Sequence, residues 1–208
     1  MDRASGGDRA AIGPRLSSRW RDEAHLAGGT PRQRRAHAAL AELGVLRDLA
    51  RFDATLIGTV PIGVDLPDSD LDIACRAPDP LEFEAEVRRL YGAMSGFDVR
   101  GADVSLPAPG RAVVAAFTHA GERYELFGEA RPVEDQAGFR HMVVEARLLE
   151  LGGATLRDRV RRLRAGGART EPAFAAALGL SGDPYRRLFD LFDAGDEDLL
   201  VVVRRALD

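Results

Sequence analysis

Two aspartates separated by a single residue form the part of this sequence best suited to chemistry. Asp70 and Asp72 stand at the start of an apolar run, 71–75, which is typical of a buried strand. Side chains two residues apart on a strand point to the same face, so these carboxylates can share hard cations such as Mg²⁺. An unpaired carboxylate inside an apolar stretch is costly to bury. We therefore expect Asp70 and Asp72 to bind metal.

A tight turn and a third acid accompany the aspartate pair. Gly58 and Thr59 follow the short apolar run 54–57, and such a turn can offer backbone N–H groups and a hydroxyl to phosphate oxygens. Glu125 lies between two core-type residues in the predicted strand 123–127. A third acid on a neighbouring strand would complete a two-metal site for in-line phosphoryl transfer. The combination predicts a site for metal and a nucleoside triphosphate.

The plainer interpretation of the acidic segment is a solvated turn. Asp68, Asp70 and Asp72 would then face water, with Ser69 as a cap. A phosphohydrolase with an Asp-x-Asp nucleophile is another alternative, but such enzymes place the pair directly after an apolar strand and usually need a lysine. Here a proline-containing loop precedes the pair, and the sequence has no lysine. The metal site is therefore the favoured interpretation.

The composition excludes several classes of protein. All 29 basic residues are arginines, so neither a P-loop lysine nor a Schiff-base lysine is available. The formal net charge of −4 argues against general DNA or RNA binding. No apolar stretch approaches the roughly 20 residues of a membrane span, and the start of the chain lacks the apolar segment of a signal peptide. The single cysteine, Cys75, predicts a buried thiol in a reducing, cytoplasmic protein.

Changes in residue pattern divide the chain into three regions. Residues 1–29 are rich in Gly, Ser, Arg and Asp and are predicted to be disordered; 30–132 form a mixed α/β core, and 133–208 a helical region packed on it. The segment after Gly58 contains two prolines and is predicted to be a loop. Helices are expected from Thr30 to about 49 with a break near Gly44, and over 80–91, 136–151, 156–163, 171–178, 184–192 and 197–207. Strands are expected over 54–57, 71–75, 97–105, 112–119 and 123–127.

Several basic residues have both a structural and a functional interpretation. Arg140 and His141 begin a predicted helix and are candidates for phosphate binding. His141 is also a candidate general base, or a histidine satisfied within the core. Arg157, Arg161 and Arg164 share one helix face, which predicts either a solvated surface or a site for triphosphate or an acidic acceptor.

Two acids and four aromatic residues of the last third also have two interpretations. Glu171 and Asp183 stand where helices start, so capping explains both; acceptor binding or base catalysis is the alternative. Core packing is favoured over a base-stacking platform for the aromatic residues. These are Phe174, Tyr185, Phe189 and Phe192.

Taken together, the motifs resemble a known family. Gly58-Thr59, ten residues, the pair Asp70 and Asp72, and a later strand glutamate look like the DNA polymerase beta-type nucleotidyltransferase superfamily. More closely, the chain resembles a bacterial family within it, domain of unknown function 4269 (DUF4269). That resemblance spans about residues 33–192. It rests on the stretches 58–63, 69–73 and 125–128, on Gln136 with 140–142, and on 170–174 and 182–185.

The resemblance implies an α+β fold of the polymerase beta type, a small mixed sheet flanked by helices, with a helical C-terminal portion. It implies two Mg²⁺ ions, or Mn²⁺ in their place, on the catalytic residues Asp70, Asp72 and Glu125. The implied nucleotide-binding residues are Gly58, Thr59, Ser69, Arg140 and His141.

The reaction implied by the resemblance transfers a nucleoside monophosphate from an NTP, with ATP the first choice, to an acceptor hydroxyl. The acceptor is a small molecule, RNA or a protein. The alternative is a catalytically inactive nucleotide-binding or protein-interaction module, with a toxin–antitoxin or sensory role, that retains the fold.

Overall fold

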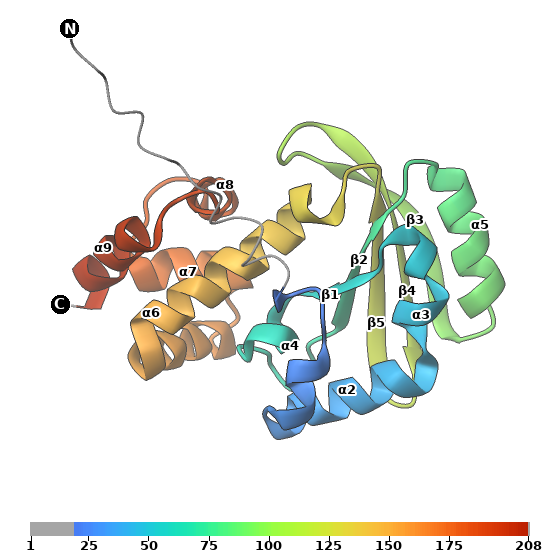
Figure 1. Ribbon diagram of the computed structural model, residues 1–208, viewed down its shortest axis with the longest axis horizontal. Coiled ribbons are helices and arrows are strands. Elements are labelled where there is room, and N and C mark those ends of the chain that lie inside the picture. Colours follow the sequence, from blue (N-terminus) through green and yellow to red (C-terminus); the bar gives the residue numbers. More distant parts are fainter. Residues whose placement is uncertain (1–18, 208) are drawn as a thin grey trace, which may run out of the picture.

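A five-stranded mixed sheet forms the centre of the molecule (Figure 1). The computed structural model describes residues 19–207. The strands are β1 (Thr55–Ile57), β2 (Leu71–Arg76), β3 (Ser95–Val104), β4 (Gly110–His119) and β5 (Glu122–Glu129). Their order in the sheet is β1-β2-β5-β4-β3, in which β2 and β5 run parallel and the other neighbouring strands run antiparallel. The predicted α+β class is confirmed.

One face of the sheet is covered by α2 (Pro31–Leu43), α3 (Val45–Asp48) and α5 (Pro80–Tyr91). Helix α2 begins as predicted, because Thr30 and Gln33 form a capping box ahead of Pro31. It ends where Gly44 adopts a left-handed conformation, with φ of 75°. The thiol of Cys75 is fully buried in the core between these helices and the sheet, as its apolar setting predicted.

Four helices that lie beside the sheet share a second core (Figure 1). These are α6 (Ala137–Ala165), α7 (Thr170–Leu178), α8 (Pro184–Leu191) and α9 (Asp196–Leu207). Helix α6 bends at Gly153, whose φ of 57° and ψ of −150° are not helical, so its two halves correspond to the two helices expected there. No helix within residues 19–207 is long and apolar enough to cross a membrane.

The segment 19–29 differs from the disordered extension expected over 1–29. It contains the 3₁₀ helix η1 (Ala24–Gly28), and Leu26 is fully buried under α2. Trp20 is buried in the core of the opposite face. The composition did not predict this structure, because the segment is mostly polar and only two separate apolar residues, Trp20 and Leu26, pack into the cores. The predictions for residues 1–18 lie outside the described residues.

A short helix replaces the first four residues of the loop that was expected after Gly58, and 63–70 have no helix or strand, as expected. Helix α4 (Thr59–Ile62) begins immediately after that glycine and ends at Gly63. Pro61 stands in its first turn, where the missing proline N–H has no partner within a helix in any case. Two further 3₁₀ turns, η2 (Ala50–Phe52) and η3 (Val133–Asp135), complete the described elements.

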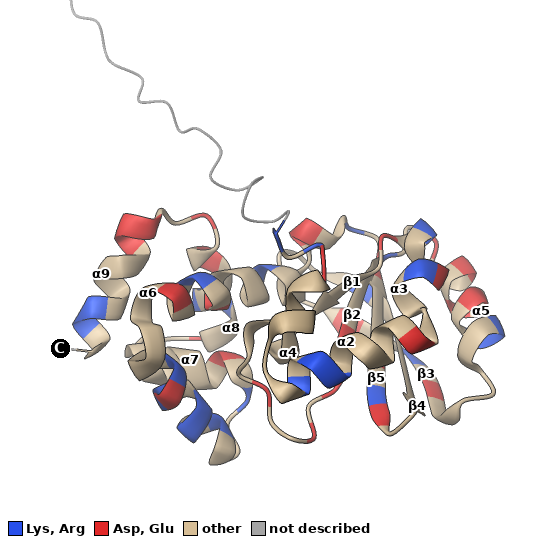
Figure 2. Ribbon diagram, turned by 60° about the horizontal axis from the view of Figure 1, so that its bottom comes forward, with Lys and Arg blue, Asp and Glu red and all other residues tan. Residues whose placement is uncertain are grey.

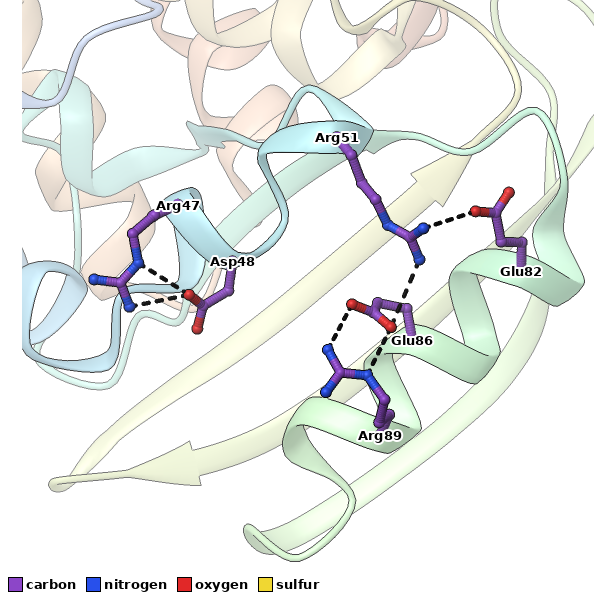
Figure 3. Close-up of polar contacts among 6 residues, drawn as sticks. All are labelled: Arg47, Asp48, Arg51, Glu82, Glu86 and Arg89. Carbon is purple, nitrogen blue, oxygen red and sulfur yellow. Dashed lines mark hydrogen bonds and ion pairs between the residues drawn. The ribbon is translucent and has the colours of Figure 1, made fainter.

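Exposed ion pairs tie α5 to the segment before β1. Arg51 lies 2.9 Å from Glu82 and 3.6 Å from Glu86, and Glu86 also pairs with Arg89 at 2.8 Å (Figure 3). Along α5 and α9 the acidic residues lie toward the N-terminal end and the arginines toward the C-terminal end, which suits the helix dipole (Figure 2). Exposed pairs of this kind contribute little to stability, each about 0–1 kcal/mol, so the two apolar cores hold the fold together.

Candidate active site

A cavity of about 580 Å³ lies between the sheet and the helices of the second core. Its sheet side is formed by the end of β1, the start of β2 and the middle of β5, and its other side by α6, α7 and α8. Six of the eight residues predicted for the site line this cavity: Gly58, Thr59, Asp70, Asp72, Glu125 and His141.

Strand register explains how the acids reach one place. Asp72 of β2 pairs with Glu125 of β5 in the parallel register, and with Ile57 of β1 on its other side. Directly paired residues point to the same face, so the carboxylates of Asp72 and Glu125 are neighbours. Asp70 lies two residues before Asp72 and borders the same cavity. Asp70 precedes the first residue of β2, so the alternation of side chains along the strand does not by itself fix its direction.

Gly58 lies against Asp72 and has a backbone conformation that other residues avoid. Its φ is 82° and its ψ −151°, in a region that is essentially restricted to glycine. A Cβ at position 58 would collide with Oδ2 of Asp72. Only glycine therefore lets the turn into α4 lie directly beneath the carboxylate.

Burial and mutual repulsion dominate the electrostatics of the acids. Burial, followed by the nearby carboxylates of Glu125 and Asp70, raises the pKa of Asp72 to about 7. Burial also raises the pKa of Asp70, although the guanidinium of Arg123 opposes this. Carboxylates that repel one another at a cavity wall form a site that a cation would stabilise.

The three acids are hard oxygen donors of the kind that Mg²⁺ binds, so their chemistry fits this ion. Two of them point toward arginines: Asp70 lies 3.6 Å from Arg123, and Glu125 lies 3.9 Å from Arg100. Within residues 19–207, no group of three or more His, Cys, Asp or Glu side chains is close enough together to hold a metal ion. A shared site on all three acids would therefore require Asp70 and Glu125 to turn away from their arginines.

The structure does not bring Ser69 and Arg140 to the cavity wall. The hydroxyl of Ser69 accepts a hydrogen bond from the N–H of Leu66 at 2.8 Å. The guanidinium of Arg140 donates to the carbonyl of Glu134 and to Asp135, both at 3.1 Å, and lies over the rings of two phenylalanines of the α8 region. Both side chains that were predicted to bind phosphate therefore have local partners instead.

His141 lines the cavity, but both of its ring nitrogens have partners. Nε2 lies 2.9 Å from the carbonyl of Tyr185, and Nδ1 lies 3.2 Å from Oε1 of Glu171. Burial opposes ionisation of Glu171, yet the hydrogen bond and charge of His141 lower its pKa overall. Glu171 therefore joins α7 to α6 rather than capping a helix, whereas Asp183 caps α8 as predicted by accepting from the N–H of Tyr185 at 3.0 Å.

The end of α4 is held by side chains from distant parts of the chain. Nε2 of Gln33 donates to the carbonyls of residues 60 and 61, each at 3.0 Å. Arg157 donates to the carbonyl of residue 62 and Arg161 to that of residue 63, each at 2.7 Å, and Arg164 donates to that of residue 64. Arg161 remains exposed, yet all three arginines of this face of α6 donate to backbone carbonyls. They satisfy carbonyls that a helix end leaves without partners.

Four polar residues that were not among the candidates from the sequence also line the cavity. They are Gln136, Glu145, Arg169 and Thr170. Glu145 had a visible signal, since it is an acid within the apolar run 142–149, and its side chain is only 3% exposed. Arg164, expected on a solvated face, is 9% exposed and reaches the same wall.

The mixed sheet, the Gly-Thr turn and the acids of adjacent strands are the features on which the family resemblance rested. The chain belongs to the family described as domain of unknown function (DUF4269), whose model matches residues 38–191. The family predicted from the motifs is therefore confirmed. No curated protein matches the chain.

Solved structures of terminal uridylyltransferases resemble this chain. One of Cid1, described for its RNA terminal uridylyl transferase activity, is 15% identical, with a TM-score of 0.46 over 74% of this chain and 46% of that one. Cid1 in complex with its short product ApU is 14% identical, with a TM-score of 0.45 over 86% and 53%. A cytoplasmic RNA terminal U-transferase is 18% identical, with a TM-score of 0.42 over 63% and 38%. The chain spans about half or less of each of these structures, and what those proteins bind remains a property of those proteins.

Proposed function

We propose that this protein is a Mg²⁺-dependent nucleotidyltransferase that moves a nucleoside monophosphate from an NTP to an acceptor hydroxyl. The observation that supports the proposal is the carboxylate pair of Asp72 and Glu125, on adjacent parallel strands, directly above the Gly58 turn and beside Asp70. Metal ions bound there would polarise phosphate oxygens and neutralise the charge of the triphosphate.

Five of the cavity-lining residues have a role in this proposal. Asp70, Asp72 and Glu125 would hold the metal ions, and the hydroxyl of Thr59 would contact the triphosphate. Arg169, an exposed cation among the cavity-lining residues, supplies positive charge at the mouth. The acceptor oxygen bonds to the α-phosphorus while the bond to pyrophosphate breaks, and the hydroxyl proton passes to Glu125. ATP is the proposed donor, and the acceptor is a small molecule, RNA or a protein.

The test is transfer of label from α-³²P-labelled NTPs with Mg²⁺, to the purified protein and to a cell extract. Wild type is expected to label an acceptor, and the Asp70→Ala/Asp72→Ala variant to label none. Asp68→Ala is the matched control, because Asp68 is an exposed acid of the same loop that does not line the cavity. Transfer that persists in the double variant would contradict the assignment of these acids.

A second candidate function is a non-catalytic nucleotide-binding module. The observation that favours it is the pairing of Asp70 with Arg123 and of Glu125 with Arg100, which directs two acids away from a common metal. This alternative predicts that the wild-type protein binds Mg²⁺–NTP but labels no acceptor. Replacing Arg100 and Arg123 with glutamine should then strengthen metal binding without producing transfer.

A further inference from the structure

The cavity wall opposite the acids is built mainly from one face of α6. Gly138, His141, Met142 and Glu145 lie at positions i, i+3, i+4 and i+7, so they form a single stripe along the helix. Arg164, from the second half of α6, and Tyr185, from α8, extend the same wall. This wall has no role in the proposed binding of metal or triphosphate.

Glu145 is the exceptional residue of this wall. It is 3% exposed, and its Oε1 has no hydrogen-bond partner among the described residues. Burial, reinforced by the nearby charge of Glu171, raises its pKa well above that of an ordinary glutamate, although Arg164 opposes the shift. A buried acid without a partner destabilises a fold, so stability does not explain a glutamate here.

Arg164 offers a second unpartnered group on the same wall. Its Nη1 donates to the carbonyl of Val64, whereas its Nε is buried without a partner among the described residues. His141 and Glu171 are bound to each other and are not available. The wall therefore presents one carboxyl group and one N–H donor.

We propose that Glu145 and Arg164 bind the hydrogen-bonding edge of the nucleobase of the NTP, an inference that rests on the proposed function. A base edge presents a donor beside an acceptor, which matches a carboxyl group beside an N–H. Tyr185 and Phe127 both line the cavity, and such aromatic rings can stack on the flat face of a base.

Binding of triphosphate and binding of the base can be measured separately. The probes are α,β-methylene analogues of ATP, GTP, CTP and UTP, which prevent transfer, and inorganic tripolyphosphate, all with Mg²⁺ and followed by calorimetry. Wild type is expected to bind at least one of the four analogues more tightly than tripolyphosphate. Glu145→Leu should lower the affinity for the preferred analogue by about tenfold or more. The affinity for tripolyphosphate should remain unchanged.

Two further variants separate recognition from packing. Glu145→Gln retains a donor and an acceptor of the same shape, so it should bind nucleotide much as wild type does. Glu150→Leu is the matched control, since Glu150 is an exposed acid of the same helix that does not line this cavity. Should Glu145→Leu fail to fold, Glu145→Met provides the apolar comparison.

The outcomes distinguish this inference from the proposed function. If Glu145→Leu lowers neither affinity, or lowers both equally, Glu145 does not read the base and the inference is overturned. If it lowers only the affinity for nucleotide and Glu145→Gln retains it, the inference is supported. If wild type binds tripolyphosphate no better than an Asp72→Asn variant does, the proposed function itself fails.

Discussion

The Gly58→Ala substitution tests most directly whether the turn and the acids form one site. The backbone of Gly58, with φ of 82° and ψ of −151°, costs a residue with a side chain about 1–3 kcal/mol. In addition, the new Cβ would collide with Oδ2 of Asp72, so the carboxylate must move by roughly 1 Å. A misplacement of that size can lower a reaction rate by about 100-fold.

Two measurements separate the effects of this substitution. Thermal unfolding should show a midpoint lower by about 2–10 °C, the equivalent of the strain energy in a domain of this size. Label transfer under single-turnover conditions, at a temperature where the variant is folded, should fall about 100-fold.

Gly121→Ala is the matched control for Gly58→Ala. Gly121 has a φ of 80°, but a Cβ there would meet nothing within 4 Å. Because Gly121 belongs to the turn between β4 and β5, the control should lose some stability and retain activity. If Gly58→Ala were to lose stability but transfer label at the wild-type rate, the contact between Gly58 and Asp72 would have no part in the reaction.

Because the pKa of Asp72 is raised from 3.8 to about 7, its contribution to stability is present below about pH 4 and is lost as the pH rises toward 7. The free energy of unfolding, measured with urea in EDTA, should therefore fall as the pH rises from about 4 to 7. Asp72→Asn should flatten this pH dependence. An unchanged pH dependence in that variant would assign the effect to another group. Arg157→Met leaves the carbonyl of Ile62 without its partner and should cost about 1–3 kcal/mol in urea unfolding. Arg161→Met should cost less, because Arg157 also donates to the carbonyl of Gly63, at 3.4 Å. Arg162→Met, at an exposed position of the same helix, should cost less than either, and an equal cost would refute the role of the carbonyl contacts. Burial raises the pKa of Cys75, so native protein should react with a thiol reagent only at the rate of its unfolding; rapid labelling would contradict the buried position.

Local signals predicted most of the elements. The helix over 80–91 begins and ends where its pattern indicated, because Asp79 caps it and Pro80 opens it. The strands 71–75 and 123–127 were predicted from their apolar residues. Their parallel pairing, which places Asp72 beside Glu125, depends on the order of the strands in the sheet. The sequence alone predicted that these acids belong together, but not that β2 and β5 are neighbours.

Long-range packing determines what the sequence did not predict. Arg140 was predicted to bind phosphate, but its guanidinium donates to the carbonyl of Glu134 and to the carboxylate of Asp135, both in η3. Arg164 lies beyond Gly153, where α6 bends, and it lines the cavity. If the helical periodicity of the first half of α6 is continued across Gly153, the residues after it are assigned to the wrong face of the helix. Glu145 was visible as an acid in an apolar run, yet its position on the cavity wall depends on how α6 packs.

The carbonyls at the end of α4 also bear on when the site forms during synthesis. Their partners on α6 lie 95, 98 and 100 residues further along the chain. A nascent chain that has completed the sheet therefore still lacks the groups that fix the turn after Gly58. Closing loops of this length is entropically costly, so we expect these contacts to form late. The turn beneath Asp72 would then be fixed only after the second half of α6 has left the ribosome.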